Sequence, residues 1–86
     1  FDTEDEAVAI ANDTPYGLTN YLQTQDPVRT NRLLRALDAG MVVANGKSRG
    51  AGAPFGGVKA SGRAREGGRW GIEEFCDVKS IGGWVE

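Results

Sequence analysis

The fold is decided by residues 18–44, whose sequence is LTNYLQTQDPVRTNRLLRALDAGMVVA. The first seven of these residues, Leu18–Thr24, predict a short strand. Asp26 and Pro27 suit the N-cap and the first position of a helix, because an Asp side chain accepts from free amides and Pro has no amide to leave unpaired. The apolar run 41–44 predicts a strand that is buried on both faces in a parallel sheet. Strand, helix and strand at this spacing predict one βαβ unit with a right-handed crossover.

The predicted helix is amphipathic and is followed by a glycine. Its leucines fall on one face and its arginines largely on the other. Gly40 stands where a residue in the left-handed conformation commonly ends a helix. Upstream, Thr3 and Glu6 have the spacing of a capping box, which predicts another short helix. The turn-forming residues 12–17 must end that helix.

The second half of the chain is rich in glycine. Nine of the thirteen glycines lie between residues 46 and 71, and we expect residues 46–62 to form one long loop. Residues 65–75 predict a helix that its glycines weaken. Asp77–Val85 alternates imperfectly between apolar and polar residues and predicts a strand that reaches away from the body.

Phe55 is the strongest single candidate for contact with a ligand. Gly50 and Gly52 begin a pattern like G-x-G-x-x-G, but Phe55 stands where the third glycine is needed, so we do not expect a phosphate cradle. An aromatic residue between Pro54 and two glycines, on a loop after a parallel strand, projects where α/β proteins place their ligands. From the residues alone, a ring folded back onto the core is equally expected.

The other reactive side chains predict structural roles. Cys76 has acidic neighbours, which raise the pKa of a thiol, so we expect a structural cysteine and not a nucleophile. Glu73 and Glu74 are adjacent in a predicted helix and do not face each other, which predicts a solvated face. A helix that ends near Phe75 would bring Arg65 and Asp77 to one junction, where they are able to pair, either in solvent or within a subunit interface.

Composition excludes several classes of protein. The 86 residues carry a net charge of -2, one cysteine and no histidine. A disulfide framework, a Cys/His zinc site or other metal centre, and a histidine-dependent hydrolase are therefore not expected. Neither nucleic acid nor a membrane is expected as a partner, because the charge is mixed and no apolar run is long enough. We expect a soluble, cytoplasmic protein, and the start at Phe1 predicts a processed or engineered chain or a piece of a longer one.

Five stretches of the chain resemble the aldehyde dehydrogenase family. They are EAVAIANDTPYGL at 6–18, AGMVVAN at 39–45, PFGGVKASG at 54–62, REGG at 65–68 and DVKSI at 77–81. The last four are similar to the family patterns AGxVxxN, PFGGxKxSG, GREGG and EVKxV, except that Ala64 replaces a glycine. The stretches cover nearly all of the chain, in the right order and spacing.

The resemblance implies an α/β fold, which is part of a parallel-sheet catalytic domain (the βαβ unit, a Gly-rich loop and a short helix) plus a C-terminal oligomerisation strand. Residues 1–75 would be the C-terminal portion of the catalytic domain, and residues 76–86 the oligomerisation-domain strand. Such enzymes oxidise a small-molecule aldehyde to a carboxylic acid with NAD or NADP and form homodimers or homotetramers. Their catalytic Cys and Glu, and most of the cofactor site, would lie upstream of Phe1, so the 86-residue chain alone would be inactive. The alternative is a free-standing, non-catalytic interaction module derived from this family.

The resemblance also assigns roles to particular residues. Phe55 would line the substrate tunnel, and Asn45 would lie near its mouth. The residues implied at the subunit interface are Arg65, Asp77 and Lys79.

The loop between Asn45 and Pro54 departs from the family. Many relatives place an aromatic residue there as a wall against the substrate, whereas this chain has Lys47 and Arg49 on a glycine-rich segment. The two cations are either solvated charges or binding groups for an anionic substrate.

Overall fold

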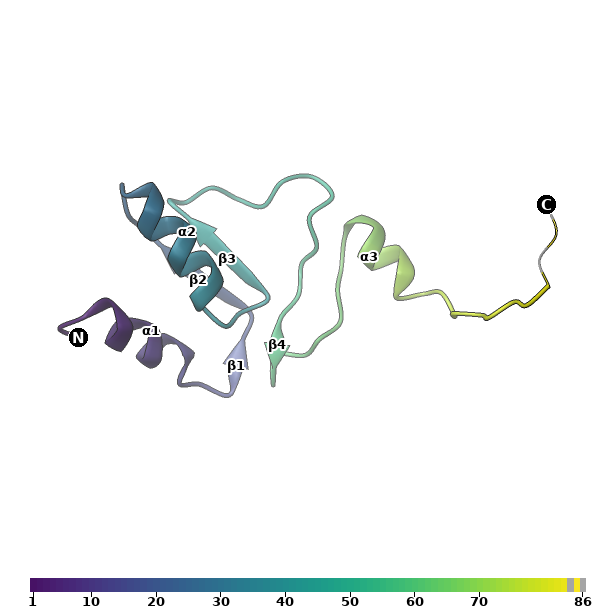
Figure 1. The fold of residues 1–86 in the computed structure, drawn as a ribbon, viewed down its shortest axis with the longest axis horizontal. Coiled ribbons are helices and arrows are strands. Elements are labelled where there is room, and N and C mark those ends of the chain that lie inside the picture. Colours follow the sequence, from purple (N-terminus) through teal and green to yellow (C-terminus); the bar gives the residue numbers. More distant parts are fainter. Residues whose placement is uncertain (84, 86) are drawn as a thin grey trace.

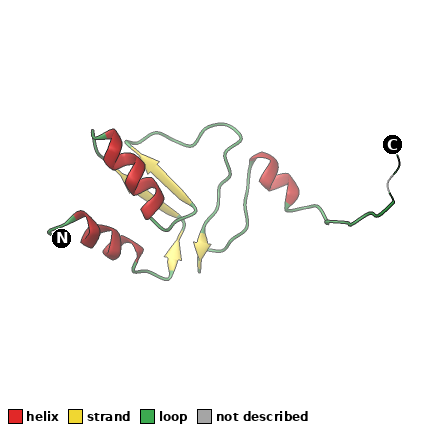
Figure 2. Ribbon diagram, in the orientation of Figure 1, coloured by secondary structure: helices red, strands yellow, loops and turns green. Residues whose placement is uncertain are grey.

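The computed structural model describes every residue except Trp84 and Glu86. Its elements are, in order, α1 (Glu4–Asn12), β1 (Tyr16–Gly17), β2 (Thr19–Leu22), α2 (Pro27–Ala36), β3 (Met41–Ala44), β4 (Val58–Lys59) and α3 (Gly68–Glu73). The first six elements lie together, whereas the chain after α3 runs away from them as an extended tail (Figure 1, Figure 2). The predicted mixed α/β class is confirmed.

β2 and β3 form a parallel pair joined by α2, which is the predicted βαβ unit. Thr19 lies opposite Met41, and Leu22 lies opposite Ala44. The expected burial of β3 on both faces is wrong for the described chain. β3 has β2 as its one hydrogen-bonded neighbour there, and all four of its residues are half-buried.

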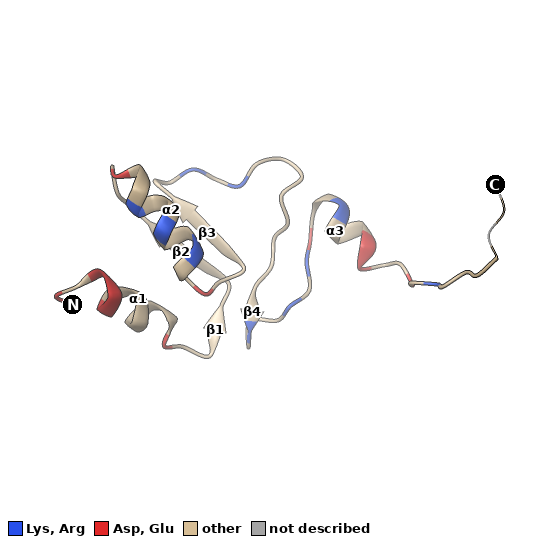
Figure 3. Ribbon diagram, viewed as in Figure 1, with Lys and Arg blue, Asp and Glu red and all other residues tan. Residues whose placement is uncertain are grey.

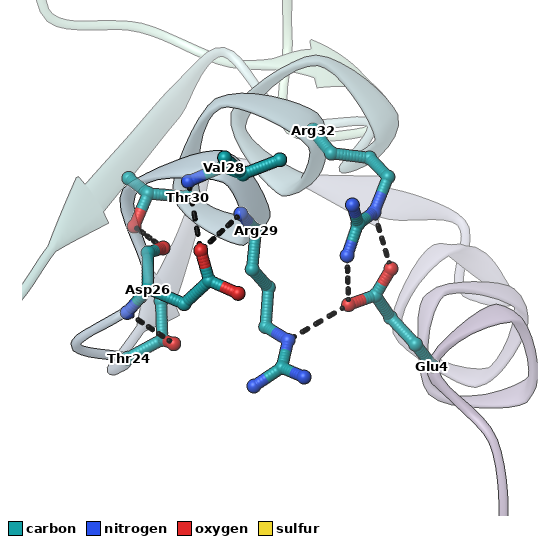
Figure 4. A network of polar contacts seen from close by, with 7 residues as sticks. All are labelled: Glu4, Thr24, Asp26, Val28, Arg29, Thr30 and Arg32. Carbon is teal, nitrogen blue, oxygen red and sulfur yellow. Dashed lines mark hydrogen bonds and ion pairs between the residues drawn. The ribbon is translucent and has the colours of Figure 1, made fainter.

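Both predicted helix N-caps are confirmed. Thr3 Oγ1 accepts from the amide of Glu6 at 3.2 Å, at the start of α1. Asp26 Oδ1 accepts from the amides of Val28 at 2.9 Å and Arg29 at 3.2 Å, at the start of α2 (Figure 4). These side chains satisfy amides that have no partner within the first helical turn.

Gly40 does not end α2 in the predicted way. The helix ends at Ala36 with Leu37 as its C-cap, and Gly40 does not have a positive φ. Close packing explains the glycine instead, because a Cβ atom on Gly40 would lie 2.6 Å from the Cα atom of Gly57. The backbone before β3 therefore lies directly against the segment that precedes β4.

β1 and β4 form an antiparallel pair beside the βαβ unit. Tyr16 lies opposite Lys59, and Gly17 lies opposite Val58. The prediction of one continuous loop over residues 46–62 is therefore wrong in its last part. Two-residue strands are too short to show a periodicity in the sequence.

Charged side chains join α1 to α2. Acidic residues lie at the start of α1, and basic residues lie along α2 (Figure 3). The Glu4 carboxylate accepts from Arg29 Nε at 3.1 Å, from Arg32 Nε at 2.6 Å and from Arg32 Nη2 at 2.8 Å (Figure 4). Hydrogen bonds, first of all from Arg32, lower the pKa of Glu4 below its usual range.

The predicted C-terminal strand does not form over residues 77–83. The helix expected over residues 65–75 is the shorter α3, and residues 77–83 form no strand. A strand needs a hydrogen-bonded neighbour, and the tail runs past none of the other described elements (Figure 1). Trp84, near the end of the predicted strand, lies outside the described residues.

The described residues form an incomplete core. The radius of gyration is 17.1 Å, against about 12 Å for a compact domain of this length. Leu33 on α2 is the one buried apolar side chain, at 9% exposed, whereas Phe75 is 94% exposed. None of the helices in this part of the chain has the length and apolar character to cross a membrane.

Candidate functional site

Phe55 is exposed and does not fold back onto the core. Its side chain is 39% exposed and lies beside a shallow hollow of about 250 Å³, whose lining includes Leu18, Arg65 and Glu66. The amide of Phe55 donates to the Glu66 carbonyl at 2.7 Å, and the amide of Glu66 donates to the Phe55 carbonyl at 2.8 Å. Of the two placements that the sequence left open, the structure supports the exposed one.

The segment after Phe55 is braced against the rest of the fold. Its strand β4 pairs with β1, and Ser61 Oγ accepts from the Gly17 amide at 3.0 Å. Lys59 Nζ donates to the last carbonyl group of α1 at 2.9 Å and forms an ion pair with Asp38 at 3.2 Å. The position of the Phe55 ring is therefore coupled to both α1 and the βαβ unit.

Arg65 stabilises the same segment by hydrogen bonds to its backbone and does not pair with Asp77. Its Nη1 donates to the carbonyl groups of Gly57 at 2.6 Å, Arg63 at 2.9 Å and Ala64 at 3.1 Å. Arg65 and Asp77 form no ion pair among the described residues, because Arg65 Nη1 is turned toward these carbonyl groups whereas Asp77 lies in the exposed tail.

The loop that follows β3 brings one of its two cations onto Phe55. Asn45 anchors the start of this loop, since its Oδ1 accepts from the Thr24 amide at 3.0 Å. Arg49 Cζ lies over the Phe55 ring, 5.3 Å from the ring centroid. Lys47 is exposed, and its ammonium forms no ion pair with the described residues. Of the two cations of the loop, Arg49 therefore contacts Phe55 and Lys47 does not.

Three candidate functional residues, Cys76, Asp77 and Lys79, lie in the tail and not beside Phe55. Asp77 and Lys79 are exposed and form no ion pair with any described residue. Cys76 is a free, exposed thiol whose Sγ lies 3.5 Å from the Ile72 carbonyl oxygen. No base or cation contacts it among the described residues, so nothing there activates it as a nucleophile.

Glu73, the last residue of α3, and Glu74, its C-cap, differ in their contacts. Glu73 faces solvent, as predicted, and its Oε1 lies 3.8 Å from Arg69 Nε. Glu74 instead accepts from the amide of Arg65 at 3.1 Å. Glu74 therefore helps to fix the turn between Phe55 and α3, which the sequence did not predict.

Sequence reasoning did not single out three residues that shape the site. Lys59 and Ser61 hold β4 in place, and Glu66 pairs with Phe55. All three lie within PFGGVKASG and REGG, so the resemblance of those stretches was the available signal.

The glycine-rich loop does not form a cradle for a dinucleotide. Such a cradle needs a strand that turns through glycines directly into the N-terminus of a helix. Here β3 is followed by the loop and then by β4, and Pro54 offers no amide. This loop therefore lacks the strand–turn–helix geometry that holds a dinucleotide pyrophosphate.

Comparison with known proteins identifies the family. The aldehyde dehydrogenase family model matches residues 1–81. The chain is 52% identical over 82 residues to the succinate-semialdehyde dehydrogenase (NADP+) 1 of Schizosaccharomyces pombe, covering 94% of this chain and 16% of that protein. The chain belongs to the aldehyde dehydrogenase family.

Solved structures agree with this assignment. The chain superposes on the crystal structure of an aldehyde dehydrogenase from Bartonella henselae with a TM-score of 0.93 and 58% identity, covering 98% of this chain and 18% of that one. The Mycobacterium tuberculosis aldehyde dehydrogenase complexed with NAD+ gives a TM-score of 0.86 and 36% identity, covering 100% of this chain and 18% of that one. The chain thus spans about one sixth of the length of these relatives.

Proposed function

We propose that this chain is part of an enzyme that oxidises an aldehyde to a carboxylic acid with NAD or NADP. Residues 1–75 would belong to its catalytic domain and residues 76–86 to its oligomerisation domain. The observation that carries the proposal is the match of residues 1–81 to the family model. The backbone supports it as well, because it superposes on the structure of an aldehyde dehydrogenase. The alternative of a free-standing interaction module is not favoured, because the matched relatives are dehydrogenases.

In this proposal the Phe55 ring forms part of the wall of the substrate path. The ring is exposed and its backbone is held by two hydrogen bonds to Glu66, so the ring is placed to offer apolar contact to the carbon chain of an aldehyde. Asn45 and Lys47 lie on the adjacent loop at the mouth of that path. These residues orient the substrate and exclude water from it.

The chemistry itself is assigned to residues outside this chain. The thiol of Cys76 contacts no base or cation among the described residues, and the glycine-rich loop lacks the strand–turn–helix geometry of a dinucleotide cradle. The nucleophilic cysteine, the general-base glutamate and the main cofactor site would lie elsewhere in the full-length protein.

The tail would form part of a subunit interface in a homodimer or homotetramer. Its apolar side chains Val78 and Ile81 are exposed, and its backbone has no hydrogen-bonded neighbour among the described residues, which suits a strand that pairs with another chain. Asp77 and Lys79 would contact that partner. Arg65 would contribute through its Nε and Nη2 donors, because Nη1 already donates to three carbonyl groups of its own chain.

The test uses the full-length protein that contains these residues. It is supplied with a series of aldehydes and with NAD or NADP, while reduced nicotinamide is followed by absorbance and the product by mass spectrometry. We expect one carboxylic acid for each reduced nicotinamide. Absence of nicotinamide reduction with every aldehyde would contradict the proposal.

A further inference from the structure

The ammonium of Lys59 contacts three acceptors that come from other parts of the fold. Its Nζ donates to the carbonyl groups of Asn12 at 2.9 Å and Thr14 at 3.3 Å, and it lies 3.2 Å from Asp38 Oδ2. Asn12 is the last residue of α1, whereas Asp38 lies between α2 and β3. These three contacts match the three N–H donors of an ammonium. Lys59 therefore joins β4 to the end of α1 and to the connection between α2 and β3.

The backbone of Lys59 is fixed in an unusual conformation. Its φ is 56°, in the left-handed region that residues with a side chain rarely adopt. Such a conformation persists where the surrounding contacts determine it, and it is frequent at functional sites. Here the Gly62 amide donates to the Lys59 carbonyl at 3.1 Å, which closes the turn after β4. Because the side chain is also only 26% exposed, both parts of Lys59 are held in place.

Lys59 supplies the electrostatic connection between residues 55–66 and the rest of the chain. The backbone pair of Phe55 with Glu66 lies within this segment, so it does not fix the segment against the other elements. Among the described residues, Lys59 and Asp38 form the one ion pair that links the segment to another part of the fold. Because the Lys59 side chain is largely buried, solvent and salt screen this pair less than an exposed one.

The residues between Phe55 and β4 are closely packed. Gly56 and Gly57 are both buried, and a Cβ atom on Gly57 would lie 2.8 Å from the Cβ atom of Ser61. Close-packed backbone transmits a displacement and does not absorb it. A displacement of β4 therefore moves Phe55.

We propose that Lys59 is a positioning residue that sets the place of the Phe55 ring, and through it the binding of aldehydes with long carbon chains. This inference rests on the proposed function and goes beyond it, because it makes chain-length selectivity depend on an ammonium that does not touch the substrate. Loss of the ammonium leaves two carbonyl groups and a carboxylate without their cation, and β4 shifts. The ring then loses its contact with a long chain, whereas an aldehyde too short to reach the ring is unaffected.

The test measures the steady-state kinetics of the full-length protein with octanal and with propanal. Lys59→Met should raise KM for octanal by about 3- to 10-fold, and should leave kcat and the KM for propanal within about twofold of wild type. In a protein that already carries Phe55→Ala, the same substitution should change KM for octanal by less than about twofold, because the effects of residues that act through one another do not add. Arg35→Met is the matched control and should leave both KM values unchanged, because Arg35 is an exposed cation of α2 that forms no ion pair with the described residues.

Three results would overturn the inference while leaving the proposed function intact. They are an unchanged KM for octanal in Lys59→Met, an equal rise in KM for both aldehydes, and the same rise for octanal with and without the Phe55 ring. If Lys59→Met does not fold, Lys59→Gln carries the same test, because its amide still donates to carbonyl groups. Failure of both variants to fold would give Lys59 a role in the whole fold and would also overturn the inference. If the wild-type protein oxidises no aldehyde, the inference and the proposed function both fail.

Discussion

Replacing Gly40 by alanine inserts one methyl group between the start of β3 and the segment that carries Phe55. The added Cβ atom would lie 2.6 Å from Gly57 Cα and 2.7 Å from the carbonyl carbon of Gly56. These atoms and the Gly56 carbonyl oxygen, which lies closest of all, belong to the backbone, so no side-chain rotation relieves the overlap, and the segment must move by about 1.5 Å to reach ordinary contact distances. Overpacking of this kind costs about 1–3 kcal/mol. The φ of Gly40 is not positive, so the cost arises from packing and not from backbone strain.

We expect the substitution to lower both the stability of the full-length protein and its catalytic efficiency. Gly40→Ala should lower the denaturation midpoint and, because Phe55 moves with its segment, lower kcat/KM for the aldehyde by about tenfold or more. Gly50→Ala is the matched control, because a Cβ atom there meets nothing within 4 Å. If the two variants have the same midpoint and the same kinetic constants, the backbones of Gly40 and Gly57 do not pack as described.

Three further predictions concern separate parts of the chain. Phe55→Ala should raise KM mainly for aldehydes with longer carbon chains, by the equivalent of about 1–3 kcal/mol; a KM that is unchanged across chain lengths in steady-state kinetics would place the ring away from the substrate. Hydrogen bonds, first of all from Arg32, lower the pKa of Glu4 in the folded state. Its contribution to stability is therefore present above the unfolded pKa of about 4.3 and disappears as the pH falls through the lower folded value. Urea midpoints of wild type and Glu4→Gln should converge below about pH 4, and a constant difference down to pH 3 would argue against the Glu4 network. Val78→Glu should weaken subunit association in sedimentation experiments, and an unchanged oligomer would remove the tail from the interface.

Local signals were sufficient to predict the βαβ unit. Asp26 and Pro27 define the start of α2 through interactions within one helical turn. The apolar run of β3 follows at a distance that permits a parallel return beside β2. Each of these signals is contained in a few consecutive residues, so the sequence alone reveals them.

Contacts between distant residues were not predictable in the same way. β4 exists because Lys59 and Ser61 are held by residues more than 40 positions away, and Gly40 is explained by a neighbour that only the fold brings near. The tail was predicted as a strand from its composition, but a strand forms only with a neighbour, which the described residues do not provide. For the site, the loop position of Phe55 was predictable, whereas the placement of Arg49 over its ring depends on the path of the whole loop.

In the proposed enzyme, this segment would contact the substrate through Phe55 and leave the chemistry to residues outside the chain. The most direct measurement is a crystal structure of the full-length protein with its carboxylic acid product bound. We predict that the carbon chain of the product lies within about 4 Å of the Phe55 ring and that Cys76 lies away from the product carboxyl. A product bound beside Cys76, or one that does not contact Phe55, would contradict this account.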